Sequence, residues 1–313
     1  MKSHKFNYLF DVPERQKIRV IIDTDCKNEA DDQFALVHAL LTPKFIIPGV
    51  IGAHFGTQKC SDSMIRSYNE ILKVMNLMDL DGFAPVKKGA ENAIPDINTP
   101  VISEGSELIV SEALKDDPTP LFAIFWGPLT DMASAILSNP EIEDKIHVIW
   151  IGGAAWPVGG YEYNLGNDIN AANVVMKSKV PVDIITMPAF RHIYVSFAEM
   201  NYRVAPYGKI GRYLFDQLIE FVGNIDPNGK TWFGESWCLG DSPTIGLLLN
   251  PHEYGYEVHP APQYSKEMYY IHTENNRPIR IYSKMDSRFL LEDFYSKLAL
   301  NYPMTSNFDK KDS

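Results

Sequence analysis

The sequence predicts an α/β fold with a doubly wound, mostly parallel sheet and helices on both of its faces. Three observations support this prediction. Short apolar runs rich in β-branched residues alternate with amphipathic segments through the first two thirds of the chain. Several of these runs end at Gly-Pro, Gly-Gly or Asp. The 313 residues are 45% hydrophobic, enough for one large core, and no linker, charge block or internal repeat divides them.

The expected elements alternate as far as residue 187. Residues 19–22 form a short buried strand because β-branched side chains dominate them, and a helix opens at Asp31 and Asp32 and runs roughly to Leu41. Later strands are expected at 45–51, 121–126, 146–151 and 180–187. Further helices are expected at 61–75, at 171–177 and around Met132, Ala133, Ile136 and Leu137, which recur at helical spacing.

The last third of the chain has a different pattern. We expect helices at 207–222, 241–249 and 286–300, a polar aromatic loop at 224–238, and a β-hairpin of strands 268–272 and 279–282. We therefore predict one domain over residues 1–313, in which 1–17 is an N-terminal extension and 200–313 is mostly helical with that hairpin.

Composition and charge argue against several classes of protein. A net charge of −11 disfavours a nucleic-acid partner, because phosphate binding requires clustered Lys and Arg. No apolar run approaches the length of a membrane span, and residues 1–17 lack the apolar core of a signal peptide. Three widely spaced cysteines form neither a zinc motif nor a disulfide framework. We expect a cytoplasmic protein that binds a small molecule, with no nucleic-acid or membrane partner.

Five acidic residues after the first strand are the most informative feature of the chain. Asp23, Asp25, Glu29, Asp31 and Asp32 fall within ten consecutive positions. Alternation along the strand puts Asp23 and Asp25 on one face, and the helix dipole accommodates one or two carboxylates at the start of the next helix. Five carboxylates repel one another unless a cation lies between them. The cluster indicates a hard divalent cation such as Ca²⁺ or Mg²⁺; the alternative is a solvated acidic loop that caps the helix.

Other strand ends are expected to meet this cluster. Asp25, Gly127 and Gly153 each follow an apolar strand. In a doubly wound sheet these positions converge at one edge, where ligands bind beyond the carboxyl ends of the strands. The sequence therefore predicts a single pocket there.

Four segments, in this order, resemble the nucleoside hydrolase family, the inosine–uridine-preferring N-ribohydrolases. The family's strand-DxDxxxDD-helix pattern is matched by Asp23, Asp25, Asp31 and Asp32. A strand followed by GPLTN, a GG turn followed by E-[FY]-N, and a late Asp closely followed by Pro are matched by residues 126–131, by 152–153 with 162–164, and by 241–243. The resemblance implies the fold above, calcium-dependent hydrolysis of ribonucleosides to base and ribose, and a homo-oligomer, dimer or tetramer.

The resemblance also implies residue roles. Asp25 is expected to ligate Ca²⁺ and to act as general base on a water molecule. The other expected metal ligands are Asp32, Asp241 and the main-chain carbonyl of Trp126. The expected substrate contacts are Asp31 at a ribose hydroxyl, Glu162 and Asn164 at the sugar, and Asp241, with Asp23 as support. Taken singly, Asp241 is better explained as a helix cap, and Asn164 is also explained as an ordinary turn residue; the set of residues carries the interpretation.

The sequence departs from the family pattern at four places. The approach to Glu162, residues 156–161, lacks the usual Gly-Asn, so different sugar contacts are expected there. The loop after Asp25 is two residues longer than the common spacing, so Asn28 or Glu29 is expected to add or replace a contact. Gly56 stands where members often have Asn, which removes one ribose contact. Gly240 stands where many members have a His that protonates the leaving base. The leaving group therefore needs another route.

Two routes are open for the leaving base. One is a different acid, for which His54, His192 and Tyr163 are candidates; His54 is also a candidate substrate contact. The other is stacking of the base on Trp232 and Trp237, which raises its basicity so that solvent protonates it. The alternative for both tryptophans is that they pack the loop or a subunit contact.

The predicted chemistry is physically coherent. Cleavage of an N-glycosidic bond passes through an oxocarbenium-like sugar, which surrounding carboxylates stabilise. Alternatives are a metal-dependent hydrolase of another riboside, a catalytically impaired ribose- or nucleoside-binding homologue, and a phosphotransfer enzyme. The last is disfavoured because the sequence has no Gly-rich phosphate loop with a nearby Lys cluster.

Overall fold

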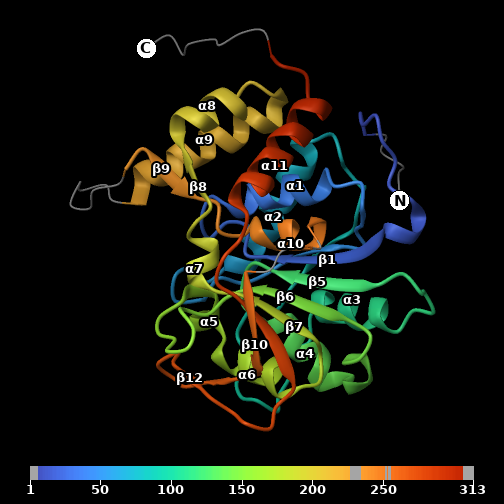
Figure 1. The fold of residues 1–313 in the computed structure, drawn as a ribbon, viewed down its shortest axis with the longest axis vertical. Helices are drawn as coiled ribbons and strands as arrows, with labels where there is room; N and C mark the ends of the chain where they lie inside the picture. The colour runs from blue at the N-terminus through green and yellow to red at the C-terminus, as the bar shows by residue number, and fades with distance from the viewer. Residues whose placement is uncertain (1–5, 226–233, 251, 253–254, 306–313) are drawn as a thin grey trace.

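The computed structural model describes residues 6–225, 234–250, 252 and 255–305, and a nine-stranded sheet runs through its centre (Figure 1). Its strands are β1 (Ile18–Thr24), β2 (Phe45–Ile46), β3 (Val50–Gly52), β4 (Val86–Lys88), β5 (Leu121–Phe125), β6 (His147–Ile151), β7 (Val182–Ile185), β10 (Tyr256–Pro260) and β13 (Pro278–Tyr282). They lie in the order β10-β13-β7-β6-β5-β1-β3-β4, with β2 also paired to β1. All pairings are parallel except that of β10 with β13.

Helices cover both faces of this sheet, so the predicted fold class is confirmed (Figure 1). One core lies beneath α1 (Asp32–Leu40), α2 (Ser63–Leu77), α9 (Gly208–Ile225), α10 (Pro243–Leu249) and α11 (Ser287–Asn301). The other lies beneath α3 (Glu104–Ala113), α4 (Thr130–Ser138) and α6 (Ile169–Lys177). Among the described residues, no helix is both long and apolar enough to cross a membrane.

Short elements outside the main sheet connect these layers. They are the paired strands β8 (Tyr194–Ser196) and β9 (Ser236–Cys238), the paired strands β11 (Gln263–Tyr264) and β12 (Tyr270–Ile271), and the helices α5 (Tyr163–Asn167), α7 (Met187–Phe190) and α8 (Phe197–Arg203), with single 3₁₀ turns at Glu14–Gln16 and Pro140–Ile142. Strands β8 and β9 join the end of α7 to the segment before α10, which matters for the site below.

The order of the strands reverses between β1 and β5. From β1 the chain goes to β3 and β4 on one side, then returns to β5 and continues through β6 to β7 on the other. At such a reversal the loops after neighbouring strands diverge and leave a crevice at the carboxyl edge of the sheet. The segments after β1 and β5, which carry Asp25 and Trp126, lie at this crevice.

Two expectations about strands are wrong. The single strand expected at 45–51 is split into β2 and β3, because Pro48 between them has no N–H to donate to a ladder. The predicted hairpin of 268–272 with 279–282 does not form. Instead β12 pairs with β11, and β13 enters the main sheet between β7 and β10. Ile279 and Ile281 of β13 are 2% exposed, a burial that the two-sided position in the sheet provides and a surface hairpin does not.

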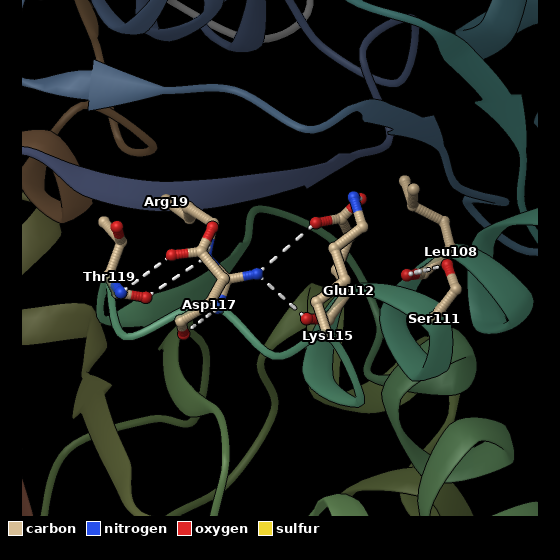
Figure 2. Close-up of polar contacts among 7 residues, drawn as sticks. All are labelled: Arg19, Leu108, Ser111, Glu112, Lys115, Asp117 and Thr119. Carbon is tan, nitrogen blue, oxygen red and sulfur yellow. Dashed lines mark hydrogen bonds and ion pairs between the residues drawn. The ribbon is translucent and has the colours of Figure 1, made fainter.

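A buried arginine fixes the start of β1. Figure 2 shows the Arg19 guanidinium among Glu112, in the last turn of α3, and Asp117 and Thr119, in the segment that joins α3 to β5. Its Nη1 donates to the carbonyl of Glu112 at 3.0 Å, and its Nε donates to the carbonyl of Thr119 at 3.1 Å. The Glu112 carboxylate lies 3.5 Å from the same Nη1. These bonds hold the register of β1 against β5, the two strands that flank the crevice.

Candidate active site

A cavity of about 640 Å³ opens at the crevice beyond β1 and β5. Its described walls carry six carboxylates, from Asp25, Glu29, Asp31, Asp32, Glu162 and Asp241. Most of the other lining side chains are aromatic or apolar, and the described lining contains one cationic side chain, that of Arg191. The pocket predicted from the strand ends is therefore present, and its lining is strongly acidic.

Three carboxylates form the tightest acidic group. One oxygen from each of Asp31, Asp32 and Asp241 lies within 4.8 Å of the others, and all three residues are buried. Asp31 and Asp32 begin α1, and Asp241 lies two residues before α10. The Thr24 hydroxyl donates to Asp32, and the Gly240 N–H donates to Asp31 Oδ2 at 2.9 Å. The chain thus holds three carboxylates together with few donors to neutralise them.

Ionisation of these buried carboxylates is unfavourable when no positive charge is near them, and their pKa values are therefore raised. Burial, reinforced by neighbouring carboxylates, raises the pKa of Asp25, Asp31 and Asp241 well above its usual range. Burial raises the pKa of Asp32 to about 7, although the Thr24 hydroxyl acts in the opposite direction. A divalent cation with oxygen ligands would remove this repulsion, so the donor set fits such an ion.

Asp25 lies apart from the tight group. It is 2% exposed, its Oδ2 is buried, and that oxygen accepts no hydrogen bond from the described residues. A Cβ on Gly127 would lie 3.2 Å from the Asp25 Cβ, so the glycine after Trp126 makes room for this side chain. The carboxylate ligands predicted from the sequence were Asp25, Asp32 and Asp241, whereas the tight group consists of Asp31, Asp32 and Asp241.

Asn164 and Glu162 approach the same wall from the start of α5. The Asn164 Nδ2 donates to the carbonyls of Trp126 at 3.1 Å and Ile151 at 2.9 Å, and its Oδ1 accepts no hydrogen bond from the described residues. The Glu162 carboxylate accepts backbone N–H groups of Gly153, Asn164 and Leu165. Glu162 therefore caps α5 as well as lining the cavity, whereas Asn164 keeps an acceptor for a ligand.

A second buried carboxyl pair lies behind the site. Asp23 is fully buried, and burial together with Asp131 raises its pKa. Asp131 accepts the backbone N–H of Ala90 at 3.1 Å and the hydroxyl of Ser103. The sequence interpretation assigned Asp23 to support of the site but missed Asp131. The signal was the Asp at the last position of the GPLTN pattern.

Not all predicted contacts reach the cavity. His54 and His192 are absent from its described lining. The His54 Nε2 lies 2.8 Å from the Thr130 hydroxyl, and burial lowers the pKa of His54 to about 4. His192 is exposed and contacts the carbonyl of Pro188. Neither histidine that was predicted as an acid or a substrate contact therefore lines the described part of the cavity.

Aromatic side chains line part of the cavity. Trp237 is one of them and packs edge-on against Phe221 at 5.4 Å. Asn28 and Tyr163, which were candidates from the sequence, also line the cavity. Trp232 lies outside the described residues. Phe190, Arg191 and Tyr194 were missed, because the segment after β7 gave no signal beyond the end of a strand.

Comparison of the sequence with known proteins points to one family. The family model described as inosine-uridine preferring nucleoside hydrolase matches residues 20–287. The chain is 25% identical over 287 residues to the pyrimidine-specific ribonucleoside hydrolase RihA of Klebsiella pneumoniae, with 81% of this chain and 90% of that protein covered. The RihA of Salmonella arizonae is 27% identical over 250 residues, covering 72% and 78%.

Solved structures share the fold at lower sequence identity. A plant nucleoside hydrolase, PpNRh1, superposes with a TM-score of 0.72 at 16% identity, covering 91% of this chain and 99% of that one. A purine-preferring ribonucleoside hydrolase from Gardnerella vaginalis gives a TM-score of 0.70 at 18% identity, covering 90% and 98%.

Proposed function

Because the chain belongs to the inosine-uridine preferring nucleoside hydrolase family, it is a glycosidase that hydrolyses ribonucleosides, and we propose that it does so with a bound calcium ion. The observation that carries this proposal is the buried group of Asp31, Asp32 and Asp241 beside the unpartnered Oδ2 of Asp25. Carboxylates and carbonyls at flexible spacing suit calcium, which accepts six to eight oxygens.

Asp32 and Asp241 are the ligands on which the sequence and the geometry agree. We propose that Asp25 and the Trp126 carbonyl complete the set, and that Asp31 contacts a ribose hydroxyl or joins the ligands. When bound, the cation orients a water molecule and the ribose hydroxyls and lowers the pKa of the water.

The chain's own residues supply the remaining chemistry. Asp25 Oδ2 accepts the proton of the attacking water, because this oxygen has no other described partner. The remaining carboxylates stabilise the positive charge that develops on the sugar. Asn164 Oδ1 accepts a ribose hydroxyl, and Glu162 and Asp241 border the sugar. Asn28 and Trp237 line the same cavity, and Trp237 is available to stack on the base.

The identity of the base is a separate question. The curated relatives are called pyrimidine-specific, and one structural neighbour is called purine-preferring. Relatedness therefore favours neither base class here. A riboside with another aglycone, or ribose and nucleoside binding without turnover, are the alternatives. A cytoplasmic location, a single domain over 1–313 and a homo-oligomer, dimer or tetramer, stay predictions.

Release of free ribose from inosine, uridine, adenosine and cytidine tests the proposal. We expect release in the presence of Ca²⁺, none after chelation, and none from Asp25→Ala. Ribose release that persists in excess chelator would refute the calcium requirement. No release from any of the four, by folded and metal-loaded protein, would favour another riboside or a binding protein.

A further inference from the structure

The lining of the cavity carries charge of both signs. Beside its six carboxylates, the described lining has one cationic residue, Arg191, which belongs to the segment after β7 together with Phe190 and Tyr194. The Arg191 side chain forms no hydrogen bond or ion pair within the described part of the chain. Its guanidinium is therefore available to a ligand.

The fold holds Arg191 against the segment that carries Asp241. Arg191 caps the end of α7, and its N–H donates to the carbonyl of Met187 at 3.0 Å. The Cys238 thiol donates to the carbonyl of Phe190 at 3.2 Å, and the N–H of Leu239 donates to the carbonyl of Ile193 at 2.8 Å. Arg191 is thus fixed by bonds on both sides of its backbone.

The charged surroundings of Arg191 come from several elements. Its positive charge acts on Glu29, in the loop before α1, and on Cys238 of β9, where it opposes the rise in pKa that burial causes. Lys59 also acts on Glu29, but its Nζ is engaged by the carbonyl and side chain of Asn28. Of these two cations, Arg191 lines the cavity, and its side chain forms no hydrogen bond with the described residues.

Several potential proton donors of the described lining are missing or already engaged. Gly240 has no side chain, and a Cβ there would lie 3.4 Å from Phe190 Cδ2. The Tyr163 hydroxyl already donates to the carbonyl of Phe55 at 3.0 Å, and the Cys238 thiol donates to Phe190. A guanidinium stays charged at any pH the enzyme meets, so it presents donors to an acceptor but transfers no proton.

We propose that Arg191 is a further catalytic residue, one that binds the departing base and stabilises it as an anion. This inference rests on the proposed function. The C1′–N bond breaks, and its electron pair stays on the base nitrogen. A water oxygen bonds to C1′ and gives one proton to Asp25. The base anion is held by the guanidinium until solvent protonates it, so the products are ribose and neutral base.

Substitution of Arg191 combined with a series of leaving groups tests this role. Arg191→Gln removes the charge but keeps a polar side chain, Arg191→Lys keeps a point charge, and Arg66→Gln on the exposed face of α2 is the matched control. The substrates are uridine, 5-fluorouridine and p-nitrophenyl β-ribofuranoside. They are ordered by how readily the leaving group exists as an anion.

The expected result is a loss that depends on the leaving group. Arg191→Gln should lower kcat/KM for uridine by roughly 10²-fold, for 5-fluorouridine by less, and for the nitrophenyl riboside by less than about 3-fold. Arg191→Lys should lie between wild type and Arg191→Gln, and Arg66→Gln should match wild type. Metal-induced stabilisation of Arg191→Gln should equal that of wild type, which excludes misfolding.

Other outcomes overturn the inference in distinguishable ways. An equal loss on all three substrates would make Arg191 a structural or sugar-binding residue, and no loss would remove it from the reaction. Either result leaves the hydrolase intact. Failure of wild-type protein to cleave any of the three ribosides, and inosine and adenosine as well, would instead refute the proposed function, and the role of Arg191 with it.

Discussion

Replacement of Asp32 by Asn should stabilise the metal-free protein and abolish its stabilisation by calcium. Burial raises the pKa of Asp32 to about 7 from an ordinary 3.8. A raised pKa in the folded state contributes stability that is present below 3.8 and is lost as the pH rises through 7. At pH 8 the ionised Asp32 therefore opposes folding when no cation is bound, and Asn carries no charge.

The size of both effects follows from the shift and the chain length. The rise in the pKa of Asp32 from 3.8 to about 7 corresponds to a loss of about 4 kcal/mol in the free energy of unfolding at pH 8. A chain of 313 residues unfolds with an entropy of about 0.7 kcal/mol per kelvin. Asp32→Asn should thus raise the Tm of chelator-treated protein by up to about 6 °C. Calcium at about 100 times its Kd should raise the Tm of wild type by about 4 °C and leave that of the variant unchanged.

Thermal unfolding at pH 8, with Ca²⁺ or with chelator, measures both effects. Asp144→Asn is the control, because Asp144 is exposed and outside the site. Asp25→Asn and Asp31→Asn tested in parallel show which of these two residues joins Asp32 and Asp241 as a ligand. The reasoning would be refuted if chelated Asp32→Asn melted below wild type while calcium still stabilised it as strongly as it stabilises wild type.

Three further predictions concern catalysis, folding and pH. Asp25→Asn should lower kcat for ribose release by roughly 10²–10⁴-fold, and a smaller loss would exclude a general base at this position. Arg19→Met should lower the free energy of unfolding, measured in urea, by about 3–5 kcal/mol, because it leaves buried hydrogen-bond acceptors without their donor. Arg66→Met, which removes an exposed ion pair, should lower it by about 0.5 kcal/mol or less. Equal losses would contradict the anchoring role of Arg19. Burial lowers the pKa of His38 to about 4, so its contribution to stability is present above 6.5 and is lost as the pH falls toward 4. When the pH falls from 7 to 5, the free energy of unfolding of the wild type should decrease by about 2 kcal/mol more than that of His38→Gln, as measured by urea unfolding at the two pH values. Equal decreases would show that His38 is not buried in its neutral form.

Local patterns decided much of the architecture. Strand β1 and helix α1 were predicted nearly at their bounds, because a run of β-branched residues and an acidic helix start act through neighbours in the chain. Four of the six carboxylates that line the cavity were found for the same reason, since Asp25, Glu29, Asp31 and Asp32 fall within eight consecutive positions. The convergence at the sheet edge followed from topology, because the carboxyl ends of parallel strands share one edge.

Partners distant in the sequence were decided by the tertiary structure. The segment 268–272 is adjacent to β13 along the chain, yet β13 pairs with β7 and β10, because its buried isoleucines require two neighbours. His54 follows a strand as Asp25 does, but its ring bonds Thr130 behind the cavity wall. No periodicity encodes which way such a side chain turns.

Sequence patterns were enough to predict the class of fold, the acidic cluster and the family. Long-range packing brings a carboxylate oxygen of Asp31 within 4.8 Å of one from Asp241, 210 positions away, and adds Arg191, which no sequence pattern indicated, to the lining of the same cavity. The physical reason is that short-range propensities act within a turn or a strand. A charge pattern across a cavity exists only after long-range packing has placed α1, α7 and the segment before α10 around the same space.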